Sequence, residues 1–167
     1  TFPSRNTCPF EEENLQKSGG WPPIAKFPSE GEWRVAVIPN KYPAVMHHEE
    51  CTALEYKGIY PLMAGIGHHD LLVTRDHKRG FADLSERDAR DLFLVFQERY
   101  RAMVNDRCLV YTSSFFNWGP NAGASVAHHH YHMLTLPIIP PDVQLSLRGS
   151  EAYFKKHRRC AYCDIIR

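Results

Sequence analysis

The 167-residue chain is 43% hydrophobic and 12% aromatic, which is enough apolar material for one folded domain with its own core. Its formal net charge of +1 argues against a basic surface for duplex nucleic acid or an anionic membrane, but not against small phosphorylated ligands. No apolar run approaches the length of a bilayer span, and the first residues lack the apolar core of a signal peptide, so we expect a cytoplasmic protein.

Positions 1–32 are rich in turn-forming residues, which predicts an irregular N-terminal arm. Strand-forming, β-branched residues then predict a strand over residues 33–38 that ends at Pro39. A second strand is predicted over residues 69–74.

The clearest helix begins at Ser85, where residues 85–88 resemble a capping box. Apolar residues follow at three- and four-residue steps, at Ala89, Leu92, Phe93, Phe96, Tyr100 and Met103. One face of this helix should therefore be buried, and the spacing assigns Phe93, Phe96 and Tyr100 to the core.

Further strands are predicted over residues 108–116 and 129–136, separated by the glycine-containing loop 117–125, and a last helix over residues 142–159. Strands that are adjacent in sequence around one long helix predict an α+β fold. In this fold an antiparallel sheet is covered on one side by the helix.

The five cysteines are an odd number, and only Cys160 and Cys163 are closely spaced. This pattern does not match the disulfide framework of a small secreted domain, so we expect reduced thiols or metal ligands. Two other histidine-rich segments, residues 47–50 and 68–69, lack the spacing of a recognised metal motif, and loop or strand-edge polarity accounts for them.

A run of histidines at residues 128–132 holds the strongest candidates for chemistry. In an extended strand, His128, His130 and His132 share one face, while His129 and Tyr131 take the other. The run is embedded between a glycine-containing loop and an apolar segment, so it is no purification tag.

Imidazole titrates near neutrality, with a pKa of about 6.5, so a neutral ring can attack phosphorus while a charged neighbour protonates the leaving oxygen. Attack by His130 would give a phosphoramidate, which water or a second phosphate can break. The upstream loop offers glycines, backbone N–H groups and the Ser125 hydroxyl for a phosphate. Several of these histidines would instead be metal ligands or satisfied core groups in the plainer interpretation, but three on one face behind a glycine loop favour catalysis.

Residues 123–134 (GASVAHHHYHML) resemble the signature of the histidine-triad superfamily. Residues 69–77 and 81–85 resemble the strand and the helix start that precede the active site in that superfamily. Residues 33–44 and 8–10 are similar more particularly to the galactose-1-phosphate uridylyltransferase branch.

The resemblance implies the histidine-triad α+β fold, usually a homodimer or fused pseudo-repeats, and an enzyme that transfers or hydrolyses a nucleotidyl group. Its substrate would be a nucleotide sugar or a dinucleoside polyphosphate. His130 would be the nucleophile that carries the nucleotidyl group. The other implied contacts are phosphate binding by Ser125, Gly123 and Asn117, and nucleoside binding by Asn40 and Tyr42.

Two positions depart from the uridylyltransferase pattern. His132 stands where that branch has glutamine and resembles the hydrolase branches, where this histidine assists the leaving group, so this departure implies water as the acceptor. Glu11 replaces the second thiolate of that branch's Cys-x-x-Cys motif. Because His77 and His128 match its two histidine ligands, Cys8 and Glu11 would complete a four-coordinate zinc site, or the set would be metal-free.

Glu11 and Ala124, both departures from the transferase pattern, also favour an alternative function. The chain would then be a non-catalytic nucleotide-binding or zinc-stabilised interaction module of the same fold. Residues 160–167 resemble the start of a histidine-triad unit, so the predicted organisation is an arm (1–32), one domain (33–159) and a truncated second unit (160–167). Two reduced surface thiols at a helix end are the alternative interpretation of Cys160 and Cys163.

Overall fold

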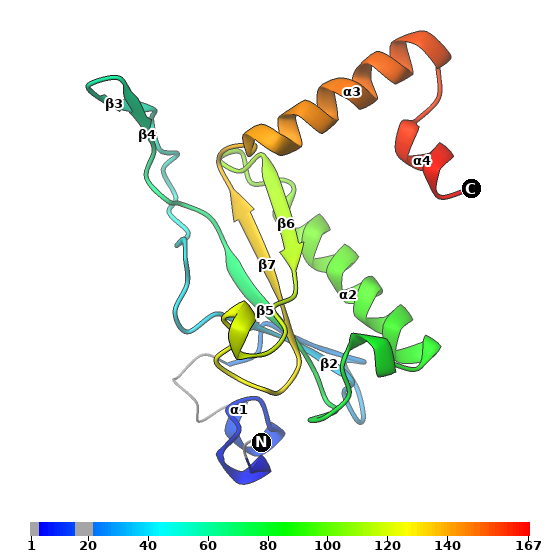
Figure 1. Cartoon of the computed structure of the whole chain (residues 1–167). Coiled ribbons are helices and arrows are strands. Elements are labelled where there is room, and N and C mark those ends of the chain that lie inside the picture. Colours follow the sequence, from blue (N-terminus) through cyan, green and yellow to red (C-terminus); the bar gives the residue numbers. More distant parts are fainter. Residues whose placement is uncertain (1–3, 16–21) are drawn as a thin grey trace. The chain divides into compact units, whose positions relative to one another are not determined.

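The computed structural model describes residues 4–15 and 22–167 (Figure 1). Its contacts divide the chain into two compact units, Thr1–Pro137 and Ile138–Arg167, which are described separately. This boundary lies before the last long helix, whereas the sequence grouped that helix with the domain over residues 33–159.

The elements of the first unit are α1 (Glu12–Leu15), β1 (Ala25–Phe27), β2 (Val35–Pro39), β3 (Glu55–Lys57), β4 (Tyr60–Leu62), β5 (His69–Thr74), α2 (Glu86–Met103), β6 (Tyr111–Phe115) and β7 (His130–Leu136). The second unit contains α3 (Pro141–His157) and α4 (Ala161–Ile165). No helix among the described residues is long and apolar enough to cross a membrane.

Five strands form one antiparallel sheet in the order β1-β2-β5-β7-β6, as Figure 1 shows for its central strands. β3 and β4 form a separate hairpin within the long connection between β2 and β5. The register places Val73 opposite His130 and Leu71 opposite His132. The predicted α+β fold with an antiparallel sheet and one long helix is therefore confirmed.

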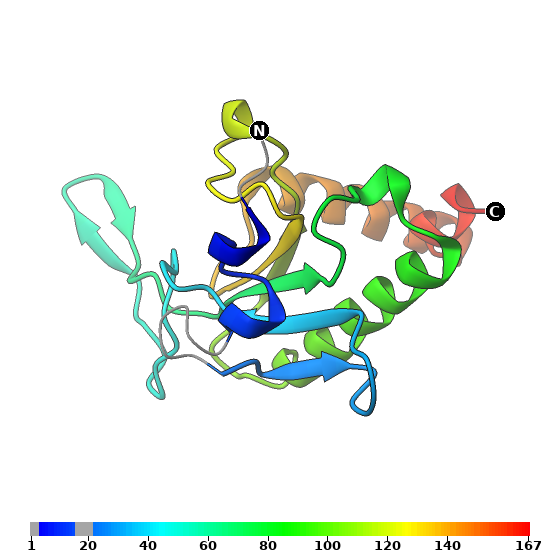
Figure 2. The same ribbon diagram turned by 90° about the horizontal axis from the view of Figure 1, so that it is seen from below.

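Alternation along β2 separates two apolar clusters, one on each face of the sheet. On one face the buried cluster comprises Val35, Val37, Leu72, Leu92, Val95, Tyr131 and Met133, which includes residues of α2. On the other face it comprises Cys8, Phe10, Leu15, Trp33, Ala36, Ile38, Leu71 and Val73. The N-terminal segment thus covers the face opposite α2, and Figure 2 shows this segment in blue across β2.

The predicted irregular arm contributes more to this unit than its composition indicates. Residues 25–27 form the edge strand β1, which pairs with β2. Cys8, Phe10 and Leu15 are buried in the cluster on the second face. A three-residue strand is too short to show a periodic pattern, and these three side chains are buried by tertiary contacts that the local sequence does not encode.

Helix α2 begins where the sequence predicts. The Ser85 hydroxyl accepts a hydrogen bond of 3.1 Å from the Asp88 backbone N–H, which caps the first turn. The core assignment was wrong for Phe93 and Tyr100, which are 56% and 47% exposed, while Phe96 packs at the edge of the cluster. The buried stripe instead consists of Asp91, Leu92, Val95 and Met103.

The expectation that all cysteines are thiols or metal ligands was also wrong for one pair. Cys51 and Cys108 form a disulfide, while Cys8, Cys160 and Cys163 are free. Fifty-seven positions separate the bonded pair. Because the fold, and not the local spacing, brings the two loops together, the sequence pattern contained no signal for this bond.

Candidate active site

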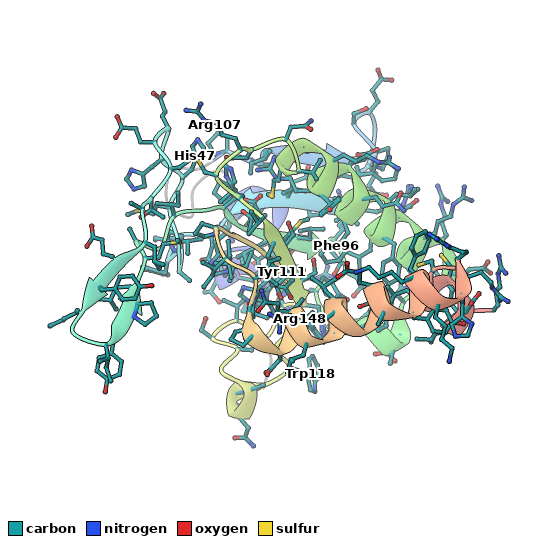
Figure 3. The ribbon with its side chains drawn as sticks, turned by 90° about the horizontal axis from the view of Figure 1, so that it is seen from above. His47, Phe96, Arg107, Tyr111, Trp118 and Arg148 are labelled. Carbon is teal, nitrogen blue, oxygen red and sulfur yellow. A yellow bond between two sulfur atoms is a disulfide. The ribbon has the colours of Figure 1, made fainter. Side chains whose placement is uncertain are left out.

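The histidine run enters β7 with its side chains alternating between the two faces of the sheet. The ring of Phe10 lies 5.9 Å from that of His128 and 5.0 Å from that of His130, and the rings of His130 and His132 are 5.2 Å apart. On the opposite face, His129 stacks on Trp118, labelled in Figure 3, at 4.3 Å. The predicted alternation is present.

His130 is held in one tautomer by a backbone contact. Its Nδ1 lies 2.8 Å from the carbonyl oxygen of His128. A carbonyl oxygen can only accept, so Nδ1 carries the hydrogen and Nε2 keeps its lone pair. Burial lowers the pKa of His130 below its usual range, which favours the neutral ring at pH 7. This is the form that a nucleophilic imidazole requires.

The His130 ring lines a cavity of about 290 Å³. The cavity brings together five residues proposed from the sequence, namely Asn40, Tyr42, Ser125, His130 and His132. Phe10 and Lys41 also line it, although neither was assigned a role from the sequence. Lys41 lies between the two predicted nucleoside contacts, so its position in the chain was the available signal.

A second cavity, of about 580 Å³, lies under the glycine-containing loop. Asn117 lines it, and Ser125 and His130 line both cavities. Gly123 lines neither cavity and ends the turn Pro120–Ala122 with a φ of 83°, a left-handed conformation that glycine adopts readily. The loop thus brings Ser125 to the junction of the two cavities beside His130.

His69 is a member of this site that the sequence analysis missed. The Ala44 N–H donates to His69 Nδ1 at 3.0 Å, so the ring carries its hydrogen on Nε2. That Nε2 lies 3.0 Å from His132 Nδ1 and donates to it, which leaves the hydrogen of His132 on Nε2. The amide nitrogen of Asn40 lies 3.1 Å from the same Nε2, but in this tautomer both groups are donors, so this approach is a packing contact and not a hydrogen bond.

Burial and the neighbouring rings of His130 and His69 lower the pKa of His132 to about 4. His132 is therefore neutral at pH 7 and offers one N–H donor. In this protonation state the ring can donate a hydrogen bond but cannot act as a strong acid. A neutral donor is also what a glutamine amide would provide at this position.

Next to the histidine run lies a group of four side chains able to hold a metal ion: Cys8, Glu11, His77 and His128. Their ligand atoms all lie within 4.8 Å of one another. His77 Nδ1 is 2.7 Å from Glu11 Oε1, and His128 Nδ1 is 3.4 Å from Cys8 Sγ. The four residues that the sequence nominated are therefore assembled in one place.

The donor set fits a divalent metal such as zinc. His128 Nε2 lies 2.6 Å from the Thr74 carbonyl oxygen and must donate to it, so the lone pair of Nδ1 points toward Cys8. Carbonyl contacts of this kind orient metal-binding histidines in proteins. Burial raises the pKa of the Cys8 thiol, so a bound cation would have to displace its proton.

Comparisons with known proteins agree with this geometry. The family model described as the Ap4A phosphorylase N-terminal domain matches residues 62–149, more than half of the chain. ADP-glucose phosphorylase from Arabidopsis thaliana is 28% identical over 165 residues, covering 97% of this chain and 46% of that protein. Galactose-1-phosphate uridylyltransferase from Thermotoga maritima is 21% identical over 136 residues, covering 81% and 43%. The chain thus spans about half the length of the curated relatives it matches.

Solved structures give the same result for the fold. A crystal structure of ADP-glucose phosphorylase from Arabidopsis thaliana with bound ADP-glucose has a TM-score of 0.77 and 26% sequence identity. The match covers 98% of this chain and 50% of that one. A structure described as uridylyltransferase has a TM-score of 0.69 and 26% identity, covering 99% of this chain and 50% of that one.

Proposed function

The chain belongs to the family of the Ap4A phosphorylase N-terminal domain, in the histidine-triad superfamily near the galactose-1-phosphate uridylyltransferase branch, and from this premise we propose that it transfers nucleotidyl groups through His130. The substrate is a nucleotide sugar or a dinucleoside polyphosphate. One observation carries the proposal: His130 Nδ1 is bound to a backbone carbonyl while its ring lines a cavity with Ser125.

In the first step, His130 Nε2 attacks the α-phosphorus of the nucleotide. The P–N bond forms as the bond between phosphorus and the bridging oxygen breaks, and its electron pair leaves with the departing phosphate. Ser125 donates to an oxygen of the transferred phosphate, and His132 donates its Nε2–H to the departing oxygen. Asn40 and Tyr42 bind the nucleoside within the same cavity.

In the second step, an acceptor oxygen attacks the same phosphorus and the electron pair of the P–N bond returns to His130. A phosphate acceptor is already anionic and needs no base, whereas water would have to lose a proton. The lowered pKa of His132 supports a phosphate as the acceptor. The neutral ring donates a hydrogen bond through Nε2–H, and it has no free nitrogen that could take a proton from water.

The same proposal assigns a zinc ion to Cys8, Glu11, His77 and His128. Bound there, the ion would supply a structural link between the N-terminal segment and β7. His128 begins the histidine run, so this link would restrain the backbone carbonyl that orients His130. Removal of the metal should then lower activity by disordering the site.

Intact-mass measurement after rapid alkaline quenching tests the covalent step, since alkali preserves phosphoramidates. The chain is incubated with ADP-glucose, UDP-glucose and diadenosine tetraphosphate in turn. We expect a nucleotidyl adduct that forms in the wild type and in His157→Ala, which alters an exposed histidine of the second unit, but not in His130→Ala. Turnover of any of these nucleotides that persists in His130→Ala, with no adduct in the wild type, would sink the scheme.

Assembly and location are predictions of the same proposal. We expect a homodimer or a fused second unit beginning near residues 160–167, and a cytoplasmic location. Sedimentation of the chain, and fractionation of cells that contain the native protein, test these two predictions.

A further inference from the structure

We propose that His47, His68 and Asp106 form a second binding site for a divalent transition-metal ion, separate from the group at Cys8. The sequence analysis attributed the two histidine-rich segments to loop and strand-edge polarity. In the structure, the potential ligand atoms of His47, His68 and Asp106 all lie within 4.8 Å of one another. Two imidazoles and one carboxylate are a ligand set that zinc and related ions accept.

The distances suit a metal centre better than a simple ion pair. Asp106 Oδ2 lies 3.5 Å from His47 Nδ1 and 3.7 Å from His68 Nε2. Ligands at the usual zinc distance of about 2.0–2.1 Å stand roughly 3.3–3.4 Å apart across a tetrahedral angle. Both nitrogens thus lie near the same oxygen, while the two imidazole rings are stacked, 14° apart with centroids at 4.6 Å. Because the lone pair of each nitrogen lies in its ring plane, one ring must rotate for both to bind one ion, and the half-exposed side chain of His47 leaves room for this rotation.

Backbone contacts hold two of the three ligands, Asp106 and His68, in place. The other oxygen of Asp106 accepts a 2.9 Å hydrogen bond from the Cys108 N–H, which leaves Oδ2 directed at the histidines. The His68 N–H donates to the Thr135 hydroxyl at 2.8 Å. A side chain at Gly67 would collide with the Thr135 carbonyl, so the chain before β5 runs directly against β7 at this point. A rigid frame of this kind is what a metal site requires.

The disulfide between Cys51 and Cys108 joins the two loops that carry His47 and Asp106. Met46, the residue before His47, forms a β-bridge with Ile66, and this bridge brings His47 beside His68. Figure 3 shows His47 beside Arg107, the residue after Asp106. The ligands therefore come from three segments that are far apart in sequence and fastened together, which lowers the entropic cost of assembling the site.

The proposed site differs from the other metal-binding candidates because none of its ligands is a sulfur atom. Cobalt titration of the EDTA-treated full chain uses this difference. The groups that contain Cys8, Cys160 or Cys163 give thiolate-to-cobalt charge-transfer absorption, whereas the site at His47 adds only visible ligand-field bands. We expect one cobalt equivalent without charge-transfer absorption, and a matching zinc equivalent by mass spectrometry of the metal.

His47→Ala should remove that equivalent or weaken its binding at least about tenfold, because a lost ligand costs more than a lost outer-shell contact. His48→Ala is the matched control, since His48 is the exposed neighbour outside the cluster. A shift of the urea midpoint of His47→Ala in EDTA would show that this variant is less stable. Asp106→Asn then tests the metal site instead, because the amide oxygen of asparagine can still accept the hydrogen bond from the Cys108 N–H.

Two results would overturn the proposal. The first is wild-type stoichiometry and affinity in both His47→Ala and Asp106→Asn. The second is binding that appears only after reduction of the disulfide and disappears in Cys51→Ser, because the thiolates would then be the ligands.

Discussion

His69 and His132 lie ring to ring on neighbouring strands of the sheet, with His69 Nε2 3.0 Å from His132 Nδ1. Because the Ala44 N–H occupies the other nitrogen of His69, the hydrogen on His132 is directed to Nε2. His69 is thus a positioning residue for the proposed reaction.

Replacing His69 by phenylalanine should lower kcat roughly 10–100-fold with little change in KM, because His132 loses the partner that sets its tautomer and orientation. His69→Gln should restore part of the activity, since its amide can donate to the same nitrogen. Steady-state kinetics on a nucleotide that the wild type turns over would measure both effects. Equal activity in the two variants would refute the positioning role.

The protein should become less stable as the pH falls from about 6.5 toward 4. The folded pKa of His132 is about 4, below its unfolded value near 6.5, so the unfolded state binds more protons between these values. The pKa values of His68, His69, His128, His129 and His130 are lowered in the same direction, chiefly by burial.

Urea unfolding at several pH values in EDTA would measure this effect. The variant His132→Gln should show a weaker pH dependence between pH 7 and 5, because one of the titrating groups is gone. A free energy of unfolding that rises on acidification would contradict the burial of these rings.

Restoring the second thiolate should tighten the metal site at Cys8. In Glu11→Cys a softer sulfur ligand replaces a carboxylate oxygen, and we expect zinc affinity to rise by about tenfold or more. Competition with a chromogenic chelator would measure the change. Glu13→Cys places a thiol two residues further along, on an exposed position outside the cluster, and should leave that affinity unchanged.

Two adjacent positions of α2 test which face of the helix is buried. Leu92 is fully buried and Phe93 is 56% exposed. Leu92→Ala should lower the free energy of unfolding by about 2–5 kcal/mol. Phe93→Ala should cost less than about 1 kcal/mol, as is usual at exposed sites. Chemical denaturation of both variants gives the comparison, and a larger loss for Phe93→Ala would place the phenylalanine side of α2 in an interface.

Local patterns predicted the elements that depend on local physics. Periodicity and capping located α2 from Ser85, and the strand pattern over residues 69–74 located β5. The histidine signature predicted the superfamily, which the family match confirms. The same signature nominated Ser125 and His132, whereas Asn40 and Tyr42 came from the resemblance of residues 33–44 to the uridylyltransferase branch; all four line the cavity with His130.

Features that depend on tertiary contacts were missed. His69 reaches His132 only because β5 pairs with β7, and His47 reaches His68 only through a bridge between loops. The aromatic residues of α2 have helical spacing, yet Leu92 and Val95 form the stripe that faces the sheet. Several faces of one helix can satisfy a three- and four-residue spacing, and only the sheet decides which of them is covered.

The bond from Cys51 to Cys108 closes a covalent ring of polypeptide that includes β5 and α2. A protease that nicks the exposed hairpin of β3 and β4 would cut inside this ring, so the two fragments would migrate as one species on a gel until a reductant separates them. In the chain-entropy account, a ring of this size restricts the unfolded state by about 4 kcal/mol. The strand that carries His69 is therefore held by its covalent connectivity as well as by its hydrogen bonds.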